Sequence, residues 1–275
     1  MPAPDTAVDL ALLQSIVREA GGIARAFFGG SYKQWDKGKG NPVTEADIAV
    51  NRFLLESLRA ARPDYGWLSE ETDDNPERLT AETIFVVDPI DGTIAFMKGR
   101  PHFTISVAVV CNGRSVAGVV FNPILDEMFA ARVGAGASLN DEPIHVSGQT
   151  DIENCRMVAD AGMFRHPAWN NPPNRPWPQM HIENRNSIAY RLALVAAGQW
   201  DAMMALSSKR DWDVAAGDLI LTEAGGIVTT HEGAPLRYNR PETVLPSIVG
   251  ANPVLHARLL ERVGHIRLPR AQGQS

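Results

Sequence analysis

Two aspartates stand three residues apart, directly after a short apolar run. In VVDPIDGT (residues 86–93), the run from Ile84 to Val87 predicts a buried strand that carries Asp88 at its carboxyl end. Pro89 cannot extend a central ladder, so the strand is expected to stop there. The N–H groups of Gly92 and Thr93 would then form an anion site at the start of a short helix. Carboxylates beside a phosphate repel it unless divalent cations lie between them.

The ligand types favour magnesium as that cation. The candidate ligands are all oxygens, and no Cys/His pair stands at the spacing of a zinc site. An ordinary Asp-Gly surface turn explains the segment equally well when it is taken alone. The two interpretations therefore have to be separated by other parts of the chain.

Three other segments present carboxylates at the ends of predicted elements. Glu70 follows the apolar pair Trp67-Leu68, and Asp213 begins a helical pattern after Trp212. Asp47 stands three residues after Thr44, in the position of a capping box. Each has a plainer explanation, namely a solvated glutamate pair, an N-cap and a helix cap respectively.

Taken together, the segments resemble the inositol monophosphatase superfamily of magnesium-dependent, lithium-sensitive phosphatases. The matching pieces, in the family's order and near its spacing, are NPVTEAD (41–47), LSEET (68–72), VVDPIDGTIAF (86–96) and WDVAAGDLILTEAGG (212–226). The superfamily also contains 3′(2′),5′-bisphosphate nucleotidases and certain fructose-bisphosphatases, and the resemblance covers about residues 8 to 260. It implies an α/β fold in an αβαβα layered sandwich, and commonly a homodimer.

The resemblance also implies roles for single residues around two or three Mg²⁺ ions. Glu70, Asp88 and the carbonyl of Ile90 would hold one metal, and Asp88, Asp91 and Asp213 a second, while Glu70 would help to hold a third through water. Asp47 with Thr93 would orient and deprotonate the attacking water. The backbone of Gly92 and Thr93 would grip the phosphate, and Asp91 would also contact the substrate. Such a site hydrolyses a phosphate monoester with metal-activated water and needs no phosphoenzyme.

The substrate is less well defined by the sequence. The inositol-specific branch has a glutamate seven residues before its WD aspartate, where this chain has Leu206. Lys209 and Arg210 would suit a second phosphate, which leans the interpretation toward 3′-phosphoadenosine 5′-phosphate, although a solvated basic turn explains them nearly as well. Ser187 and Arg191 are predicted substrate contacts, in a segment without the family's usual Gly-Ser pair. Inositol-1-monophosphatase, histidinol-phosphatase, fructose-1,6-bisphosphatase, a non-catalytic phosphate-binding protein and a glycosidase with paired carboxylates remain as alternatives.

Hydrophobic periodicity predicts the elements that must carry these residues. Helices are expected over 6–28, from Thr44 to before Pro63, and over 187–198, 213–224 and 253–263. Strands are expected over 84–87, 103–110, 116–121, 128–131, 156–159, 201–206, 227–229 and 247–249. We expect an α+β half over residues 1–150 with most metal ligands and an α/β half over 151–275 that contributes Asp213. The proline-rich segment 167–178 is expected to be a loop whose Trp169 and Trp177 either cap a ligand or anchor the loop.

Composition narrows the class of protein further. The 275 residues carry a net charge of −6 and 44% hydrophobic residues, as an ordinary globular protein does, with no basic run for a nucleic acid polymer or an anionic membrane. No secretory signal or membrane span is expected in the sequence. Cys111 and Cys155 are expected to be free thiols, which favours a reducing cytoplasm. The expected partner is a small phosphate monoester.

Overall fold

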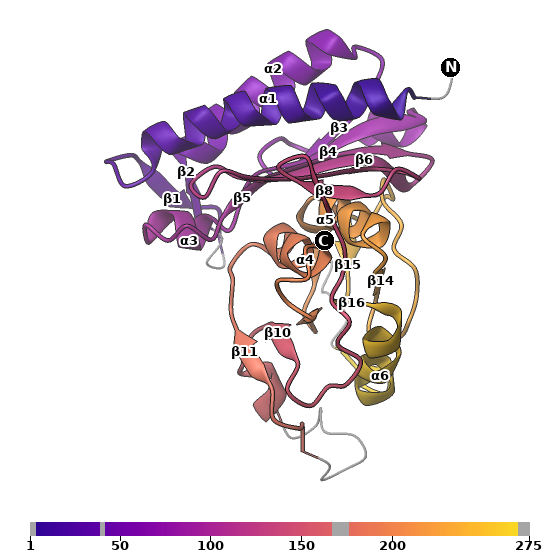
Figure 1. Cartoon of the computed structure of the whole chain (residues 1–275). Coiled ribbons are helices and arrows are strands. Elements are labelled where there is room, and N and C mark those ends of the chain that lie inside the picture. The colour runs from indigo at the N-terminus through magenta and orange to yellow at the C-terminus, as the bar shows by residue number, and fades with distance from the viewer. Residues whose placement is uncertain (1–3, 39–41, 167–175, 269–275) are drawn as a thin grey trace.

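A computed structural model describes residues 4–38, 42–166 and 176–268 of the chain, and these fold into five alternating layers. Two helices cover a seven-stranded sheet, two more helices lie beneath that sheet, and a five-stranded sheet and a last helix follow (Figure 1). The predicted αβαβα sandwich is confirmed.

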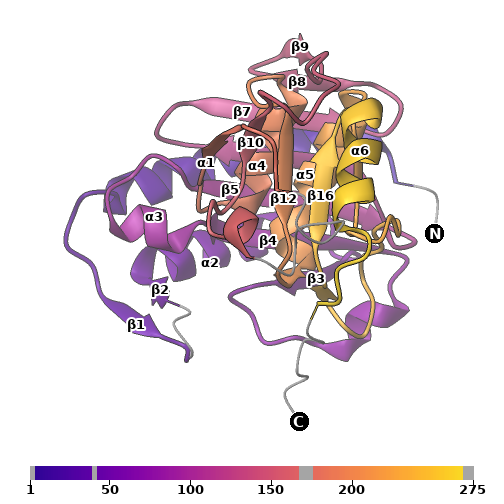
Figure 2. The same cartoon turned by 90° about the horizontal axis from the view of Figure 1, so that it is seen from below.

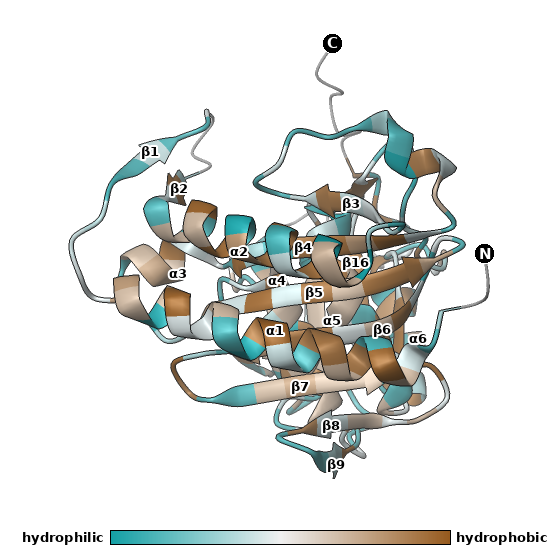
Figure 3. Ribbon diagram, turned by 90° about the horizontal axis from the view of Figure 1, so that it is seen from above, coloured by the Kyte–Doolittle hydropathy of each residue, from teal (hydrophilic) through white to brown (hydrophobic). Residues whose placement is uncertain are grey.

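The outer helical layer consists of α1 (Thr6–Phe27) and α2 (Glu45–Ala61). Each is amphipathic, and the buried faces contribute Leu13, Val17, Val50 and Leu54 to one hydrophobic core with the upper face of the large sheet. Figure 3 shows both helices lying across this sheet, with brown and teal residues alternating along them. Thr44 and Asp47 form the predicted capping box of α2, which fixes where that helix begins.

The large sheet has the order β3-β4-β5-β6-β7-β8-β9. Its strands are β3 (Gly66–Ser69), β4 (Thr83–Asp91), β5 (Thr104–Cys111), β6 (Arg114–Asn122), β7 (Glu127–Arg132), β8 (Ala137–Leu139) and β9 (Glu142–Ile144). Only β3 and β4 are parallel, and the rest form an antiparallel meander. The hairpin of β5 and β6 turns at Asn112-Gly113, as predicted, with both residues at positive φ.

The middle helical layer consists of α4 (Ile188–Ala196) and α5 (Asp211–Glu223), which pack between the two sheets (Figure 2). The second sheet has the order β11-β10-β12-β16-β14. Its strands are β10 (Arg156–Val158), β11 (His181–Glu183), β12 (Ala202–Ala205), β14 (Ile227–Thr229) and β16 (Ile248–Ala251). Helix α6 (Pro253–Val263) covers the far face, where Leu255 and Leu259 are fully buried.

Short elements complete the described chain. They are the hairpin β1 (Gln34–Asp36) and β2 (Pro42–Thr44), the 3₁₀ turns η1 (Pro76–Thr80) and η2 (Met163–Arg165), α3 (Thr93–Met97), and the pair β13 (Lys209–Arg210) and β15 (Val244–Leu245). Most of these were not predicted, because elements of two to five residues carry no detectable hydrophobic period. Residues 167–175 of the proline-rich segment, Trp169 included, lie outside the described residues. The Trp177 ring packs edge-on against Phe164, with Arg262 above it, which agrees with the anchoring interpretation for that residue.

The predicted end of strand β4 is wrong. The strand that was expected to stop at Asp88 continues through Pro89 to Asp91. Its pairing with β5 shifts register between Asp88 and Asp91, and its pairing with β3 has already ended at Val87. Pro89 therefore lies at a position where no backbone N–H is needed for pairing with a neighbouring strand. Its missing N–H group costs no hydrogen bond there.

The chain passes from the large sheet to the second sheet around the boundary expected at residue 150, since β9 ends at Ile144 and β10 begins at Arg156. However, α4 and α5 share one hydrophobic core with strands of the large sheet and with Met203 and Ile248 of the small one. The division into 1–150 and 151–275 therefore stays a prediction. None of the helices that the structure describes has the length and hydrophobicity needed to cross a bilayer.

Candidate active site

The end of β4 brings two carboxylates to a sharp corner between strand and helix. Asp88 is 1% exposed, and its Oδ1 accepts a hydrogen bond of 3.1 Å from the Ile90 N–H. Gly92 then turns the chain at φ +99°, and a Cβ there would lie 3.0 Å from the His102 carbonyl oxygen and 3.1 Å from the Ser187 nitrogen. Only glycine fits this position, because both its conformation and its surroundings exclude a side chain.

Asp91 is held by the first turn of α4, which comes from the other half of the chain. Its Oδ2 accepts hydrogen bonds from Ser187 Oγ at 2.7 Å and from the Ala189 N–H at 2.6 Å. Ser187 is fully buried and is also the N-cap of α4, where it accepts from the Tyr190 N–H at 2.9 Å. A carboxylate at a helix N-terminus is electrostatically favoured. Ser187 therefore supports Asp91 and does not line either of the two cavities described below.

Glu70 and Asp213 complete the acidic group. Glu70 follows β3, and its backbone N–H donates to the Val87 carbonyl oxygen at 3.2 Å, which ties it to β4. Asp213 lies in the first turn of α5, where its Oδ2 accepts from the Arg210 N–H at 2.8 Å. With Asp88, Ile90, Asp91, Gly92 and Thr93, both residues line one hollow of about 190 Å³. The four carboxylates thus converge from three separate parts of the chain.

Burial and mutual repulsion dominate the electrostatics of this hollow. Burial, with repulsion from Asp213 and Glu71, raises the pKa of Glu70 to about 8. Burial and the charge of Asp213 raise the pKa of Asp91 to about 7 against the hydrogen bonds that lower it. Burial and the nearby Glu70, Asp91 and Asp213 raise the pKa of Asp88 well above its ordinary range. Carboxylates arranged in this way favour a positively charged occupant.

Asp47 and Thr93 meet beside the hollow. Thr93 Oγ1 lies 3.2 Å from Asp47 Oδ1 and 3.1 Å from the Ile90 carbonyl oxygen, and its one proton can serve either acceptor. Thr44 fixes the other oxygen of Asp47, to which it donates from its N–H at 2.8 Å and from its Oγ1 at 2.5 Å. Burial raises the pKa of Asp47 to about 6. Thr93 lines the hollow, so Asp47 can influence a bound molecule through the Thr93 hydroxyl.

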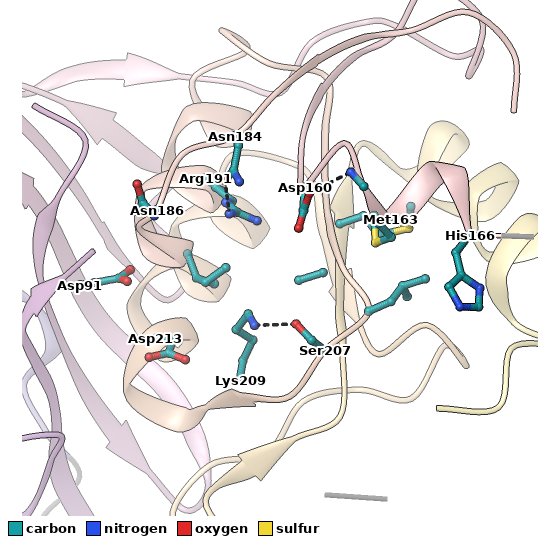
Figure 4. Close-up of a pocket in the computed structure, with 15 residues that line it drawn as sticks. Asp91, Asp160, Met163, His166, Asn184, Asn186, Arg191, Ser207, Lys209 and Asp213 are labelled. Carbon is teal, nitrogen blue, oxygen red and sulfur yellow. Dashed lines mark hydrogen bonds between the residues drawn. The ribbon is translucent and has the colours of Figure 1, made fainter. Parts of the chain in front are cut away.

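A larger cavity of about 540 Å³ shares Asp91, Asn186 and Asp213 with the acidic hollow. Figure 4 shows Asp91 and Asp213 toward one end of it and His166 toward the other. Its remaining lining combines apolar, amide and charged groups, contributed by Asp160, Gly162, Met163, Asn184, Ile188, Arg191, Met204, Ala205, Leu206, Ser207 and Lys209. Asn186 and Asp160 were not singled out in the sequence, because a lone Asn or Asp in a loop is a common turn residue.

Two positively charged side chains, Arg191 and Lys209, line this cavity, and burial lowers the pKa of both. Arg191 is fixed from behind, since its Nε donates to the Arg185 carbonyl oxygen at 2.6 Å and its Nη2 to Asn184 Oδ1 at 2.8 Å. Lys209 Nζ donates to Ser207 Oγ at 2.9 Å. Arg210 is not brought to the cavity: its Nη1 donates to Thr243 Oγ1 at 3.2 Å and its guanidinium lies 5.8 Å from the centre of the Trp212 ring. Neighbours on a strand face opposite ways, which separates Lys209 from Arg210.

Layered fold and acidic hollow together define the class of a phosphoric monoester hydrolase. The model of the inositol monophosphatase family matches residues 5–267. The chain is 33% identical to inositol monophosphatase 2 of Solanum lycopersicum over 82% of its length and 88% of the relative's. It is 37% identical to inositol-1-monophosphatase of Rhizobium meliloti over 72% and 75%. The extragenic suppressor protein suhB of Bartonella henselae superposes with a TM-score of 0.81 at 30% identity, over 93% and 98% of the two chains. The chain belongs to the inositol monophosphatase family.

Proposed function

We propose that the protein is a Mg²⁺-dependent phosphomonoesterase. The observation that carries the proposal is the convergence of four carboxylates on one hollow, those of Glu70, Asp88, Asp91 and Asp213. This hollow adjoins a larger cavity that is lined by the positively charged side chains of Arg191 and Lys209. A monoanionic or dianionic phosphate cannot approach four carboxylates directly, so a bound cation has to lie between them. The larger cavity provides room for the rest of the substrate.

The residues around the hollow fit magnesium by their donor chemistry. All the donors are carboxylate or carbonyl oxygens, which suit a hard cation that keeps part of its water shell. The described residues contain no three acidic, imidazole or thiol side chains close enough to grip one ion as they stand. On the strength of the shared hollow, we assign Glu70, Asp88 and the Ile90 carbonyl to one Mg²⁺ and Asp88, Asp91 and Asp213 to another, with Glu70 reaching a third through water.

The chain's own residues account for the remaining needs of the reaction. Bound Mg²⁺ would lower the pKa of the attacking water and neutralise charge on the phosphoryl group and the leaving oxygen. Thr93 Oγ1 would take a proton from that water as it passes its own proton to Asp47, whose pKa of about 6 leaves it ionised and able to accept a proton near neutral pH. The N–H groups of Gly92 and Thr93, which the ladder of α3 does not use, hold a phosphoryl oxygen.

For the substrate we favour one that carries a second anionic group, such as 3′-phosphoadenosine 5′-phosphate. Lys209 and Arg191 line the larger cavity and supply the positive charge, whereas Arg210 adds nothing there. Leu206, Met163 and Met204 form an apolar part of the wall, which suits a base better than a ring of hydroxyls.

Inositol 1-phosphate is the second candidate, and a specific observation favours it. The relatives from Solanum lycopersicum and Rhizobium meliloti are named as inositol monophosphatases at 33% and 37% identity. In the cavity, the Asn184 and Asn186 amides can donate to or accept from inositol hydroxyls, and the Asp160 carboxylate can accept from them. Histidinol phosphate and fructose 1,6-bisphosphate follow as weaker candidates.

Phosphate release from a panel of esters tests both levels of the proposal. The purified protein is assayed with and without Mg²⁺ on 3′-phosphoadenosine 5′-phosphate, inositol 1-phosphate, histidinol phosphate and fructose 1,6-bisphosphate. We expect Mg²⁺-dependent release, with the highest kcat/KM on 3′-phosphoadenosine 5′-phosphate. A preference for inositol 1-phosphate would reverse the order of the first two candidates. Binding of phosphate esters without any turnover would leave a phosphate-binding protein, which the intact Asp47, Thr93 and four carboxylates argue against.

A homodimeric assembly and a cytoplasmic location remain predictions from the family and from the free cysteines.

A further inference from the structure

Two segments that carry carboxylates of the acidic hollow face each other across a second space. One is the stretch from Glu70 to Asp74, which follows β3, and the other is the start of α5 with Arg210 and Trp212. Both line a hollow of about 350 Å³, to which residues 241–243 also contribute. Helix α5 also packs on the large sheet, and contacts that span this space can further fix Asp213 relative to Glu70. No residue of the proposed chemistry spans this space.

Arg78 begins such a connection from the Glu70 side. This arginine of η1 is 3% exposed, and all five of its guanidinium N–H groups have acceptors. Nε and Nη2 bind the two oxygens of Asp74 at 2.6 and 2.9 Å, which holds the pKa of Asp74 below its ordinary value. Nη1 binds Asn239 Oδ1 at 2.8 Å, and both terminal nitrogens bind the Arg240 carbonyl oxygen at 3.1 Å. Arg78 thus ties its own segment to residues 239 and 240.

Asn239 and Arg240 continue the connection to α5. The Asn239 N–H donates to Asp211 Oδ2 at 3.1 Å, and Arg240 Nη2 lies 3.6 Å from Asp211 Oδ1. Asp211 is the first residue of α5, fully buried, and its N–H donates to the Thr243 carbonyl oxygen at 2.9 Å. Asn239 Nδ2 returns a hydrogen bond to the Arg78 carbonyl oxygen at 3.1 Å. Asp213 lies in the same helical turn as Asp211.

From these contacts we propose that Asp74, Arg78, Asn239, Arg240 and Asp211 form a bridge that sets the distance between Glu70 and Asp213 and so the affinity of the site for Mg²⁺. The members of this bridge are positioning residues, because none of them lines the acidic hollow. The inference rests on the proposed metal site. It assigns metal affinity to side chains outside the site that the family motifs of this sequence do not include.

The geometry of the bridge makes it sensitive to a conservative change. A lysine at position 78 keeps the charge but offers one ammonium in place of a planar fork, so it cannot hold Asp74, Asn239 and Arg240 together. Supporting residues of metal sites typically change affinity by about 10–100-fold when they are replaced. We therefore expect Arg78→Lys to raise the Mg²⁺ concentration for half-maximal binding by about 10-fold.

Asn239→Gly cuts the bridge at a second point without straining the backbone. Asn239 has φ +53°, which glycine adopts freely, and the variant keeps the N–H that binds Asp211. It loses only the carboxamide that exchanges two hydrogen bonds with Arg78. We expect a rise of similar size, and less than the sum of both effects in the double variant, because the two changes interrupt one connection.

Arg156→Lys is the control: Arg156 has a similar set of contacts, on a side chain that is 45% exposed. Arg156 also grips an aspartate with two nitrogens, with Nε and Nη2 bound to the oxygens of Asp201 at 3.1 and 2.6 Å, and it also donates to a carbonyl oxygen, that of Gly198. It lies in the second sheet, on a strand that carries no ligand of the proposed site. We expect this variant to lower the Tm of the protein but to leave the Mg²⁺ concentration for half-maximal binding unchanged.

The experiment measures Mg²⁺ binding without substrate, from the rise in Tm during a Mg²⁺ titration and from calorimetry. A raised midpoint in Arg78→Lys and Asn239→Gly, with the wild-type midpoint in Arg156→Lys, supports the bridge, as does recovery of kcat and KM at saturating Mg²⁺. Wild-type midpoints in both bridge variants, or an equal shift in the control, overturn it while the proposed function stands. If the wild type itself gains no stability from Mg²⁺, both proposals fail. Should Arg78→Lys not fold, Asn239→Gly decides.

Discussion

Asp91 illustrates at the scale of the residue how the chain keeps acidic groups together that repel one another. Burial raises its pKa to about 7, and yet its Oδ2 is bound by a hydroxyl and a backbone N–H at the start of a helix. These donors hold the side chain in one orientation whether or not it is ionised. They do not offset the free energy that burial and the charge of Asp213 add to the ionisation of Asp91. A bound cation would offset it.

Replacing Asp91 by asparagine should separate function from stability. Asn keeps an oxygen for Ser187 and Ala189 but loses the charge, so we expect phosphatase activity to fall by more than about 100-fold, beyond the effect typical of outer residues in metal sites. In metal-free buffer the variant should be more stable than the wild type at pH 8. The gain should vanish below about pH 4, because the wild-type carboxyl, whose folded pKa is raised, is then protonated in both states. Activity assays and thermal melts check this, and near-normal turnover would refute the assignment of Asp91.

Lys209 and Arg210 provide a test of the substrate with a control built into the chain. Lys209→Gln should raise KM for 3′-phosphoadenosine 5′-phosphate by about 10-fold, since a hydrogen bond to a charged group is worth about 1.5–3 kcal/mol. KM for inositol 1-phosphate should change much less. Arg210→Gln should leave both values near wild type, because its side chain binds Thr243 outside the cavity. Equal effects of the two substitutions would contradict the role of Lys209.

Sequence reasoning at this scale found the acidic residues but not their supports. Glu70, Asp88, Asp91 and Asp213 stand in recognisable motifs, whereas Arg78 sits in a polar segment, PERLT, where an arginine is ordinarily solvated. Its buried contacts are to residues 239 and 240, more than 150 positions away, so no local pattern could reveal them. The prediction that Lys209 and Arg210 contact the same substrate was made for a related reason. Strand β13 has two residues, too few for the alternation of side chains on its two faces to be visible in the sequence.

At the scale of the element, the long helices and the central strands followed from periodicity. Helix α1 was expected over 6–28 and spans Thr6–Phe27, and α6 was expected over 253–263, as observed. Helix α5 begins two residues before the expected Asp213, since Asp211 is bound from the distant residues Asn239 and Thr243. Tertiary hydrogen bonds thus decide the one boundary that matters most for the site.

The crossing of α4 and α5 gives a prediction at this scale. A Cβ on Gly217 would lie 2.8 Å from Leu192 Cβ, so Gly217→Ala must push apart the two helices whose first turns hold Asp91 and carry Asp213. We expect a loss of about 1–3 kcal/mol, as for other overpacked cores. Gly22→Ala is the control: nothing lies within 4 Å of its Cβ position in α1, and it should stabilise by about 0.5–1 kcal/mol. Denaturant unfolding of both variants checks the pair, and a stabilised Gly217→Ala would contradict the packing.

At the scale of the whole molecule, the five layers place the acidic hollow between the end of strand β4 in the large sheet and the helices packed beneath that sheet. Glu70, Asp88 and Asp91 come from the large sheet and the corner that follows it, and Asp213 comes from a helix packed between the sheets. The hollow therefore exists only when the large sheet and these helices are packed together. Any free energy that a cation contributes there stabilises the docked arrangement as a whole.

This arrangement predicts how pH and Mg²⁺ act together on global stability. The raised pKa values of Asp47, Asp91 and Glu70, about 6, 7 and 8, exceed those of an unfolded chain, near 4, so the folded state binds more protons over this interval. Their favourable contribution is complete below about pH 4 and is lost as pH rises through about 6–8. In EDTA, Tm should therefore fall between pH 5 and 8. Saturating Mg²⁺ should reverse most of that fall and stabilise more at pH 8 than at pH 6, because it binds the ionised carboxylates. Melting curves across this grid check both signs. A Tm in EDTA that rises toward pH 8 would mean that the acidic hollow is already neutralised by the protein itself, and the need for a cation would disappear.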